Sequence, residues 1–139
     1  MQRVFTLLIV LAVTLTACQN KPTRTSEQRV SVSGGTYINI SADELNTMLK
    51  NKDFVFINVH IPYAGNITGT DLSIPYDQIR QNLSQLPADK NAKIVLYCRS
   101  GRMSAIAAES LVKLGYMHIW NLKGGMDGWE QAGYPLDGK

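Results

Sequence analysis

Apolar residues recur along this chain with two periods, which together predict strands that alternate with helices. Stretches that are almost wholly apolar, or that have strand character, occupy residues 37–40, 54–59, 72–74, 94–97 and 118–122. Continuous apolar runs of this length are typical of strands buried on both faces of a parallel sheet. The alternation of strands with helices predicts an α/β fold whose mostly parallel sheet is covered by helices on both faces.

Helical patterns fill the intervals between these stretches. Ser41 and Glu44 form a capping box, which predicts the start of a helix that runs through Leu49. Further helices are predicted around Ile79, Leu83 and Leu86, which share one face before Pro87, and over residues 104–115 and 126–131.

The first residues have the composition of an export signal. Arg3 precedes an apolar run over residues 4–13, and a cleavage site of small residues is supplied by Leu15, Thr16, Ala17 and Cys18. An uncleaved anchor helix is the weaker alternative, because a membrane span needs about 20 apolar residues. The pattern resembles the bacterial lipoprotein signal. That resemblance implies that Cys18 becomes the first mature residue and carries lipid, which anchors the protein to a membrane on the exported side, periplasmic or extracellular.

The mature chain is predicted to consist of a tether and one domain. Residues 19–35 are mainly polar or glycine, which is typical of a flexible tether. We therefore expect three parts along the chain. They are a signal peptide over 1–17, the lipidated cysteine and tether over 18–35, and a domain over 36–139. The formal charge of +3 arises before that domain, because ten basic residues face ten acidic ones from Val30 onward. A neutral domain lacks the basic footprint of a nucleic-acid partner.

Cys98 is the cysteine that remains once Cys18 is lipidated, so no disulfide within the chain is expected. It follows the apolar stretch 94–97, and sites in such sheets lie at the carboxyl ends of strands. A loop that passes from a strand into a helix gathers backbone N–H groups, and the helix adds roughly half a positive charge at its amino end. Gly101 permits a tight turn, while Arg99 and Arg102 add positive charge. We therefore expect an anion cradle that favours a Cys98 thiolate.

Spacing separates the chemistries that use a cysteine in such a loop. Cysteine phosphatases have an arginine six positions after the cysteine, where this chain has Ser104. A thioredoxin-like site has a second cysteine three positions on, where this chain has Gly101. Phosphate ester hydrolysis and sulfur transfer are the two anion chemistries that use a cysteine in such a loop, and these spacings favour sulfur transfer.

Two motifs resemble the rhodanese family. Residues 97–104 are similar to its active-site loop, and residues 122–129 with 132–135 are similar to its characteristic ending. The resemblance implies a rhodanese-like fold with a mostly parallel five-stranded sheet and helices on both faces. It also implies a thiosulfate sulfurtransferase with catalytic Cys98, which takes a sulfane sulfur from a small anionic donor as a persulfide and passes it to a thiol or cyanide. The donor site would be formed by Arg99, Ser100, Gly101, Arg102 and Met103.

The chain departs from the family pattern near that site. Asn58 and His60 occupy positions at which the family commonly has aspartate and arginine. Asn66 occupies a position at which the family has histidine. Met103 makes the mouth of the pocket more apolar than the arginine or threonine frequent there. The resemblance implies that the family residues mainly brace the loops, so these departures bear on efficiency and donor choice more than on the fold.

No cofactor is implied, and His60 and His118 have no partner at the spacing of metal ligands, so no metal is expected. Alternatives left open are a persulfide-carrying or sulfide-sensing module with little turnover, and an anion-binding domain in which Cys98 is incidental. The sequence identifies no protein partner.

Overall fold

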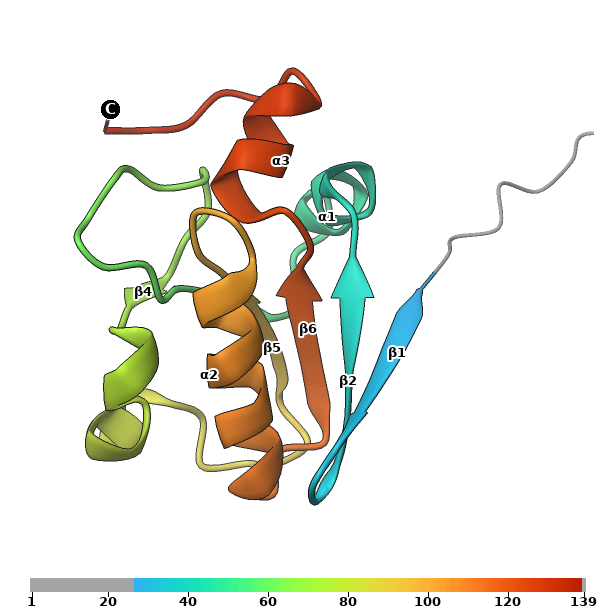
Figure 1. The fold of residues 1–139 in the computed structure, drawn as a ribbon, viewed down its shortest axis with the longest axis vertical. Helices are drawn as coiled ribbons and strands as arrows, with labels where there is room; N and C mark the ends of the chain where they lie inside the picture. The colour runs from blue at the N-terminus through green and yellow to red at the C-terminus, as the bar shows by residue number, and fades with distance from the viewer. Residues whose placement is uncertain (1–26, 139) are drawn as a thin grey trace, which may run out of the picture.

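A six-stranded sheet lies between two layers of helices in the computed structural model, which describes residues 27–138 (Figure 1). The strand order is β1-β2-β6-β5-β3-β4, and every neighbouring pair is parallel except β1 and β2. The strands are β1 (Gln28–Val32), β2 (Gly35–Ile40), β3 (Val55–Asn58), β4 (Leu72–Ser73), β5 (Lys93–Tyr97) and β6 (His118–Leu122). The helices are α1 (Ala42–Leu49), α2 (Arg102–Lys113) and α3 (Gly125–Gln131), with the 3-10 helices η1 (Tyr76–Gln78) and η2 (Arg80–Gln85). The mostly parallel α/β fold that the sequence predicted is confirmed.

The sheet begins earlier in the chain than the sequence predicted. Residues 28–32 were assigned to the tether, with the domain starting at Thr36, but they form β1, which pairs antiparallel with β2 from Gln28 opposite Asn39 to Val32 opposite Gly35. Val30 and Val32 alternate with polar residues and pack against the core, so one face of β1 is held by apolar contact. The expected five-stranded sheet therefore has six strands. The predicted signal peptide and the predicted lipidation at Cys18 lie outside the described residues.

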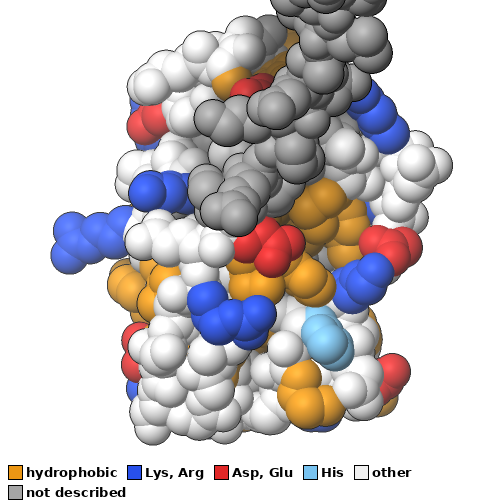
Figure 2. Space-filling model, turned by 90° about the vertical axis from the view of Figure 1, so that its right-hand side faces the viewer, with side chains coloured by type: hydrophobic (Ala, Val, Ile, Leu, Met, Phe, Trp, Pro, Cys, Tyr) orange, Lys and Arg blue, Asp and Glu red, His pale blue; other side chains and the backbone are white. Residues whose placement is uncertain are grey.

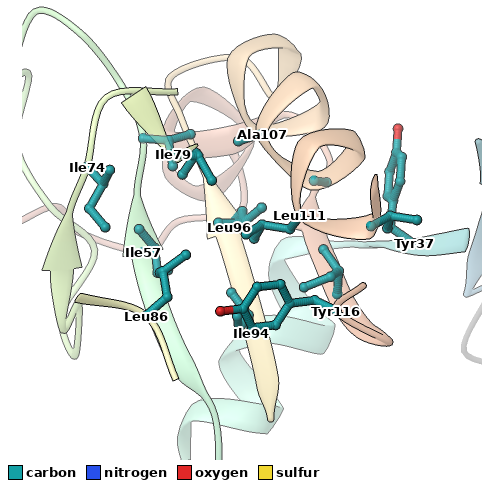
Figure 3. Close-up of a cluster of buried hydrophobic side chains, with 14 of the residues drawn as sticks. Tyr37, Ile57, Ile74, Ile79, Leu86, Ile94, Leu96, Ala107, Leu111 and Tyr116 are labelled. Atoms are coloured by element: carbon teal, nitrogen blue, oxygen red, sulfur yellow. The ribbon is translucent and has the colours of Figure 1, made fainter. Parts of the chain in front are cut away.

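Two apolar clusters fill the two faces of the sheet. One lies under α2 and the 3-10 segment, and includes Ile57, Ile94, Leu96 and Leu111 (Figure 3). The other lies under α1 and α3, and includes Leu45, Phe56, Met126 and Trp129. This division explains the continuous apolar runs of the central strands, because both of their faces are buried.

The segment around Ile79, Leu83 and Leu86 differs from the single helix that its periodicity predicted. It forms η1 and η2, and Asn82 lies inside η2 with φ −111° and ψ 23°, outside the helical region. The Asn82 side chain donates to Gln78 O at 2.8 Å and accepts from Gln85 Nε2 at 2.7 Å. Such local side-chain hydrogen bonds compete with the helical backbone pattern.

The predicted capping box is present. Ser41 Oγ accepts from the Glu44 N–H at 3.3 Å, and the Glu44 carboxylate accepts from the Ser41 N–H at 2.7 Å. These bonds start α1 directly after β2 ends. Within residues 27–138 no helix has the length and apolarity needed to cross a membrane.

Charges of both signs are mixed on the surface. Figure 2 views the molecule from the side on which β1 lies, and shows Lys and Arg side chains interspersed with Asp and Glu side chains. This distribution agrees with the balance of ten basic and ten acidic residues from Val30 onward.

Candidate active site

Cys98 directly follows β5 and lies at the edge of the sheet where the parallel strands end. Its side chain is 1% exposed and belongs to the apolar cluster under α2. The Gly101 N–H donates to Cys98 Sγ at 3.1 Å, and the hydroxyl of the fully buried Ser104 lies 3.5 Å from the same sulfur. The sulfur therefore lies against the amino end of α2, next to the Gly101 N–H and beside a hydroxyl that also lies 3.2 Å from Gly101 O.

Further donors surround the start of α2. In the described part of the chain, the backbone N–H groups of Arg99, Ser100, Arg102 and Met103 have no hydrogen-bond acceptor. Unpaired N–H groups are intrinsic to the first turn of a helix, where the helix dipole also places positive charge. An anion bound beside Cys98 would find these donors already ordered.

The loop that carries Cys98 is held from behind by α3. The carbonyl oxygens of Cys98 and Arg99 accept from the N–H groups of Met126 and Asp127, each at 2.9 Å. Gly125 makes this contact possible, because a Cβ at that position would lie 2.3 Å from Cys98 O. The loop carbonyls are thus engaged by α3, which gives the glycine-rich ending of the chain a direct role in shaping the loop.

Gly101 supports the same geometry from within the loop. Its φ of 92° lies in the left-handed region, and a Cβ there would lie 3.0 Å from Gly124 N. Residues with a side chain rarely adopt such a backbone conformation, so glycine is needed at the turn into α2.

The two arginines of the loop have different environments. Arg99 forms an exposed ion pair with Asp127, with 3.5 Å between Nε and Oδ1. Arg102 is exposed at the first residue of α2 and forms no ion pair among residues 27–138. Met103 is half-buried against the core, and Ser100 is exposed. Arg102 is consequently the arginine of this loop whose charge no described carboxylate pairs with.

Asn58 braces the loop after β3, a role that sequence reasoning did not resolve. Its side-chain NH₂ donates to Gly65 O at 3.0 Å and to Asn66 Oδ1 at 2.8 Å, while its Oδ1 accepts from the His60 N–H at 2.9 Å. Asn58 and Asn66 are both departures from the family pattern, and they bond to each other. No local sequence signal pairs two residues from opposite ends of a loop.

Tyr97 extends this network beneath the active-site loop. Its hydroxyl donates to Asn66 Oδ1 at 3.2 Å, accepts from the Ile67 N–H at 3.0 Å, and lies 2.7 Å from Thr70 Oγ1. Burial raises the pKa of Tyr97, although the hydrogen bonds from Thr70 and Ile67 oppose that shift. The phenol therefore stays protonated at neutral pH and acts as a structural hydrogen-bonding group.

Both members of the Arg99–Asp127 ion pair influence the pKa of His60 electrostatically. Its Nδ1 is buried and has no hydrogen-bond partner in the described part of the chain. Burial lowers the pKa of His60, the charge of Arg99 lowers it further, and Asp127 acts in the opposite direction. The imidazole is therefore neutral at neutral pH.

Ser104 is a second residue whose role the sequence did not indicate. Its position served to argue against a phosphatase, but its hydroxyl lies against Cys98 Sγ. A serine in the first turn of the helix, on the face turned toward the cysteine, is the signal that could have identified it. No cluster of three or more His, Cys, Asp or Glu side chains lies close enough to hold a metal ion within residues 27–138.

This site, a cysteine between a parallel strand and a helix with a glycine-rich segment behind it, defines a class of α/β cysteine domains. The family profile described as Rhodanese-like domain matches residues 41–132. The chain belongs to the rhodanese-like domain family.

Individual relatives agree with this membership. A protein of Allochromatium vinosum named a sulfurtransferase is 30% identical over 100 residues, which are 70% of this chain and 92% of that protein. A tRNA uridine(34) hydroxylase of Escherichia coli is 31% identical over 93 residues, which are 63% of this chain but only 27% of that longer protein.

Solved structures show the same fold. A rhodanese-related protein from Thermoplasma volcanium has a TM-score of 0.60 at 29% identity, covering 70% of this chain and 95% of its own. A rhodanese-like domain protein from Staphylococcus aureus has a TM-score of 0.57 at 32% identity, covering 66% of this chain and 89% of its own.

Proposed function

We propose that this chain is a lipid-anchored sulfurtransferase that carries a sulfane sulfur as a persulfide on Cys98. The observation that carries the proposal is the position of Cys98 Sγ, 3.1 Å from the Gly101 N–H and next to the first turn of α2. Helix amino ends and unpaired amides stabilise a thiolate before the reaction and the charged outer sulfur after it.

The proposed reaction has two steps and needs no external oxidant. The Cys98 thiolate attacks the outer sulfur of thiosulfate, a new S–S bond forms, and sulfite leaves with the electron pair of the broken bond. An acceptor thiolate or cyanide then attacks the outer sulfur of the persulfide, and the Cys98 thiolate is restored. Arg102 would attract the dianionic donor to the mouth of the loop.

Family membership and one relative's name favour this proposal. The Allochromatium vinosum protein named a sulfurtransferase is covered over 92% of its length. The Escherichia coli hydroxylase is covered over only 27%, so its activity is not carried over to this chain. No nucleic-acid partner is proposed.

Anchoring through Cys18 on the exported side of a membrane is part of the proposal. The pattern of Leu15, Thr16, Ala17 and Cys18 supports lipid attachment. The test is to replace Cys18 with Ser and to fractionate cells. Wild-type protein should sediment with membranes and carry an acylated amino terminus, and Cys18→Ser should be released. Firm membrane association of an unacylated variant would contradict lipid anchoring.

A persulfide carrier with little turnover is the second candidate. The observation that favours it is the 1% exposure of Cys98, because burial limits the access of thiols in solution to the sulfur. Loading a sulfur without releasing it to added thiols would support the carrier.

Mass spectrometry of the reduced full-length protein tests the proposed function. Incubation with thiosulfate should add one sulfur atom, and a thiol or cyanide should then remove it. Cys98→Ser should abolish both steps, because a serine hydroxyl cannot form a persulfide. If folded wild-type protein takes up no sulfur from thiosulfate, polysulfide or mercaptopyruvate, sulfur transfer is refuted.

Arg102→Ala tests the donor within the same experiment. Loading from thiosulfate should weaken by about 1–3 kcal/mol if the guanidinium contacts the sulfonate. Lys113→Ala is a matched control, because it removes an exposed cation from the opposite end of α2. Equal loading by both variants would show that Arg102 does not contact the donor.

A further inference from the structure

The direction of β1 brings the start of the described chain to the active-site edge. β1 runs antiparallel to β2, and Gln28 lies opposite Asn39 near the end of β2. The strands β2, β6, β5 and β3 are parallel, so their carboxyl ends share one edge, and Cys98 follows β5 there. Figure 1 shows that β1 begins on the side toward which the arrowheads of β2 and β6 point.

Gln28 and Cys98 lie at the same edge of the sheet, three strands apart. The strand order from β1 through β2 and β6 to β5 separates them by three strand spacings. At about 4.8 Å for each spacing, the start of β1 lies about 14 Å from the line of β5. The turn at Ser33 and Gly34 lies at the opposite end of β1, away from the active site.

The link between Gln28 and Cys18 is short. It consists of the nine residues 19–27, because β1 begins eight residues earlier than the predicted domain boundary at Thr36. Even fully extended, the link spans about 35 Å. A domain the size of residues 27–138 has a diameter of about 34 Å. The Cys98 edge could turn away from the anchoring membrane only if the link ran nearly straight along the whole domain, which is entropically costly.

We infer that the Cys98 edge faces the membrane to which the chain is anchored, and that its sulfur acceptor is a thiol displayed on that membrane surface by a membrane-bound molecule. This inference rests on the proposed function, because it takes both the lipid on Cys18 and the persulfide on Cys98 from it. A soluble thiol needs no particular orientation of the site. A thiol fixed near the headgroups reacts only when the Cys98 edge is turned toward the membrane, and the topology of β1 gives the domain that orientation.

The transfer step balances without a further reactant. The membrane-held thiolate attacks the outer sulfur of the Cys98 persulfide, the bond between the two sulfurs breaks, and its electron pair returns to Cys98. The products are a persulfide on the membrane-held molecule and a Cys98 thiolate. Holding both partners at one surface raises their effective concentration, and orientation decides how much of that gain is used.

The test compares two anchoring points on phosphatidylcholine vesicles. The lipidated full-length protein is loaded with thiosulfate and mixed with a cysteine peptide that is coupled to a phospholipid headgroup. Two Cys18→Ser chains are anchored instead through six histidines bound to a nickel-chelating lipid. In one the histidines follow residue 18, and in the other they are inserted between Ser33 and Gly34, at the opposite edge of the sheet.

The lipidated chain and the chain anchored after residue 18 should transfer sulfur to the headgroup peptide at least about tenfold faster than the hairpin-anchored chain. All three should react equally with the same peptide free in solution, which shows that the insertion leaves Cys98 competent. Equal rates on vesicles would overturn the inferred orientation. Failure of the proposed function would look different, because the chains would then take up no sulfur or the natural chain would carry no acyl group.

Discussion

Two asparagines near the active site form a matched pair. Each departs from the family pattern, and taken singly each looks like the loss of a bracing residue. The structure joins them, because Asn58 donates to Asn66 Oδ1 and to Gly65 O from a side chain that is 2% exposed. The loop after β3 is therefore braced by amide hydrogen bonds from two positions at which the family commonly has aspartate and histidine.

Restoring the family aspartate should consequently harm this protein. Asn58→Asp replaces two donated hydrogen bonds with a buried carboxylate facing two acceptor oxygens, so we expect a loss of about 3 kcal/mol in the free energy of unfolding. Chemical denaturation at pH 7.5 measures it, with Asn91→Asp as a control that adds the same charge on an exposed loop. Adding Asn66→His to Asn58→Asp should recover part of the loss. A stable Asn58→Asp protein would contradict this account of the loop.

His60 should make the stability of the domain depend on pH. Its pKa in the folded chain is lowered from 6.5, first by burial and then by Arg99. Between the folded pKa and 6.5 the unfolded chain binds more protons, so the free energy of unfolding rises with pH in that window. The stabilisation from the neutral imidazole is complete above about pH 6.5 and is lost as the pH falls below it.

The measurement for His60 is chemical denaturation of wild type and His60→Asn at several pH values from 5 to 7.5. The variant should lose less stability than wild type as the pH falls, because carboxylates common to both proteins contribute equally. His118→Asn, which removes the exposed histidine at the start of β6, is the control for the loss of an imidazole. Parallel pH profiles for wild type and His60→Asn would show that the environment of His60 does not affect folding.

At the scale of elements, the active-site loop depends on contact with α3. The loop carbonyls of Cys98 and Arg99 accept the first N–H groups of α3, and this contact leaves no space for a side chain at Gly125. A residue nearly thirty positions away in sequence therefore shapes the cradle around the sulfur.

Gly125→Ala should displace this loop and lower both stability and sulfur loading. The new Cβ would lie 2.3 Å from Cys98 O, at a residue whose φ is +57°. Gly133→Ala separates the effect of positive φ from the effect of the close contact. Gly133 also has a positive φ, +89°, but a Cβ there would have nothing within 4 Å. The control should lose only about 1–2 kcal/mol in the free energy of unfolding and keep its loading rate. Equal loading rates in the two variants would show that contact with α3 does not set the geometry at Cys98.

Local signals account for much of the element prediction. The capping box at Ser41 starts α1, the apolar run 94–97 lies within β5, and Cys98 lies in the loop that opens α2, all as the sequence predicted. The elements that the sequence did not predict depend on residues distant from them or on side-chain hydrogen bonds, neither of which a local apolar pattern shows. β1 is a strand because β2 pairs with it, and η2 is interrupted where Asn82 hydrogen-bonds its neighbours.

In the candidate site, too, some features follow from consecutive residues and others depend on tertiary packing. The position of Cys98, the glycine turn and the arginines follow from consecutive residues, so the sequence could indicate them. The contacts of Ser104 with Cys98 Sγ and of Asn58 with Asn66 depend on how a helix or a loop is placed in space. Tertiary packing decides that placement.

At the scale of the whole molecule, the hairpin of β1 and β2 adds two strands before the residues that the family profile matches. The family profile begins at residue 41, after both of these strands. β1 covers the edge of β2, and its Val30 and Val32 pack against the core beside α2. The hairpin therefore belongs to the folded unit, and it places Gln28 at the edge of the sheet where the parallel strands end.

Deleting residues 27–34 should destabilise the domain, whereas deleting the eight residues 19–26 should not, because only the first deletion removes β1. Both deletions are made in the Cys18→Ser chain, so that loss of the lipid affects them equally. Loss of the contacts of two half-buried valines should cost about 2–3 kcal/mol, which corresponds to a decrease in Tm of roughly 10 °C or more for a domain of this size. The uncovered edge of β2 should also promote association between chains, measurable by light scattering, because an unpaired strand edge is a template for pairing. Equal thermal stability of the two deletions would mean that β1 contributes nothing to the fold and that the domain begins at β2.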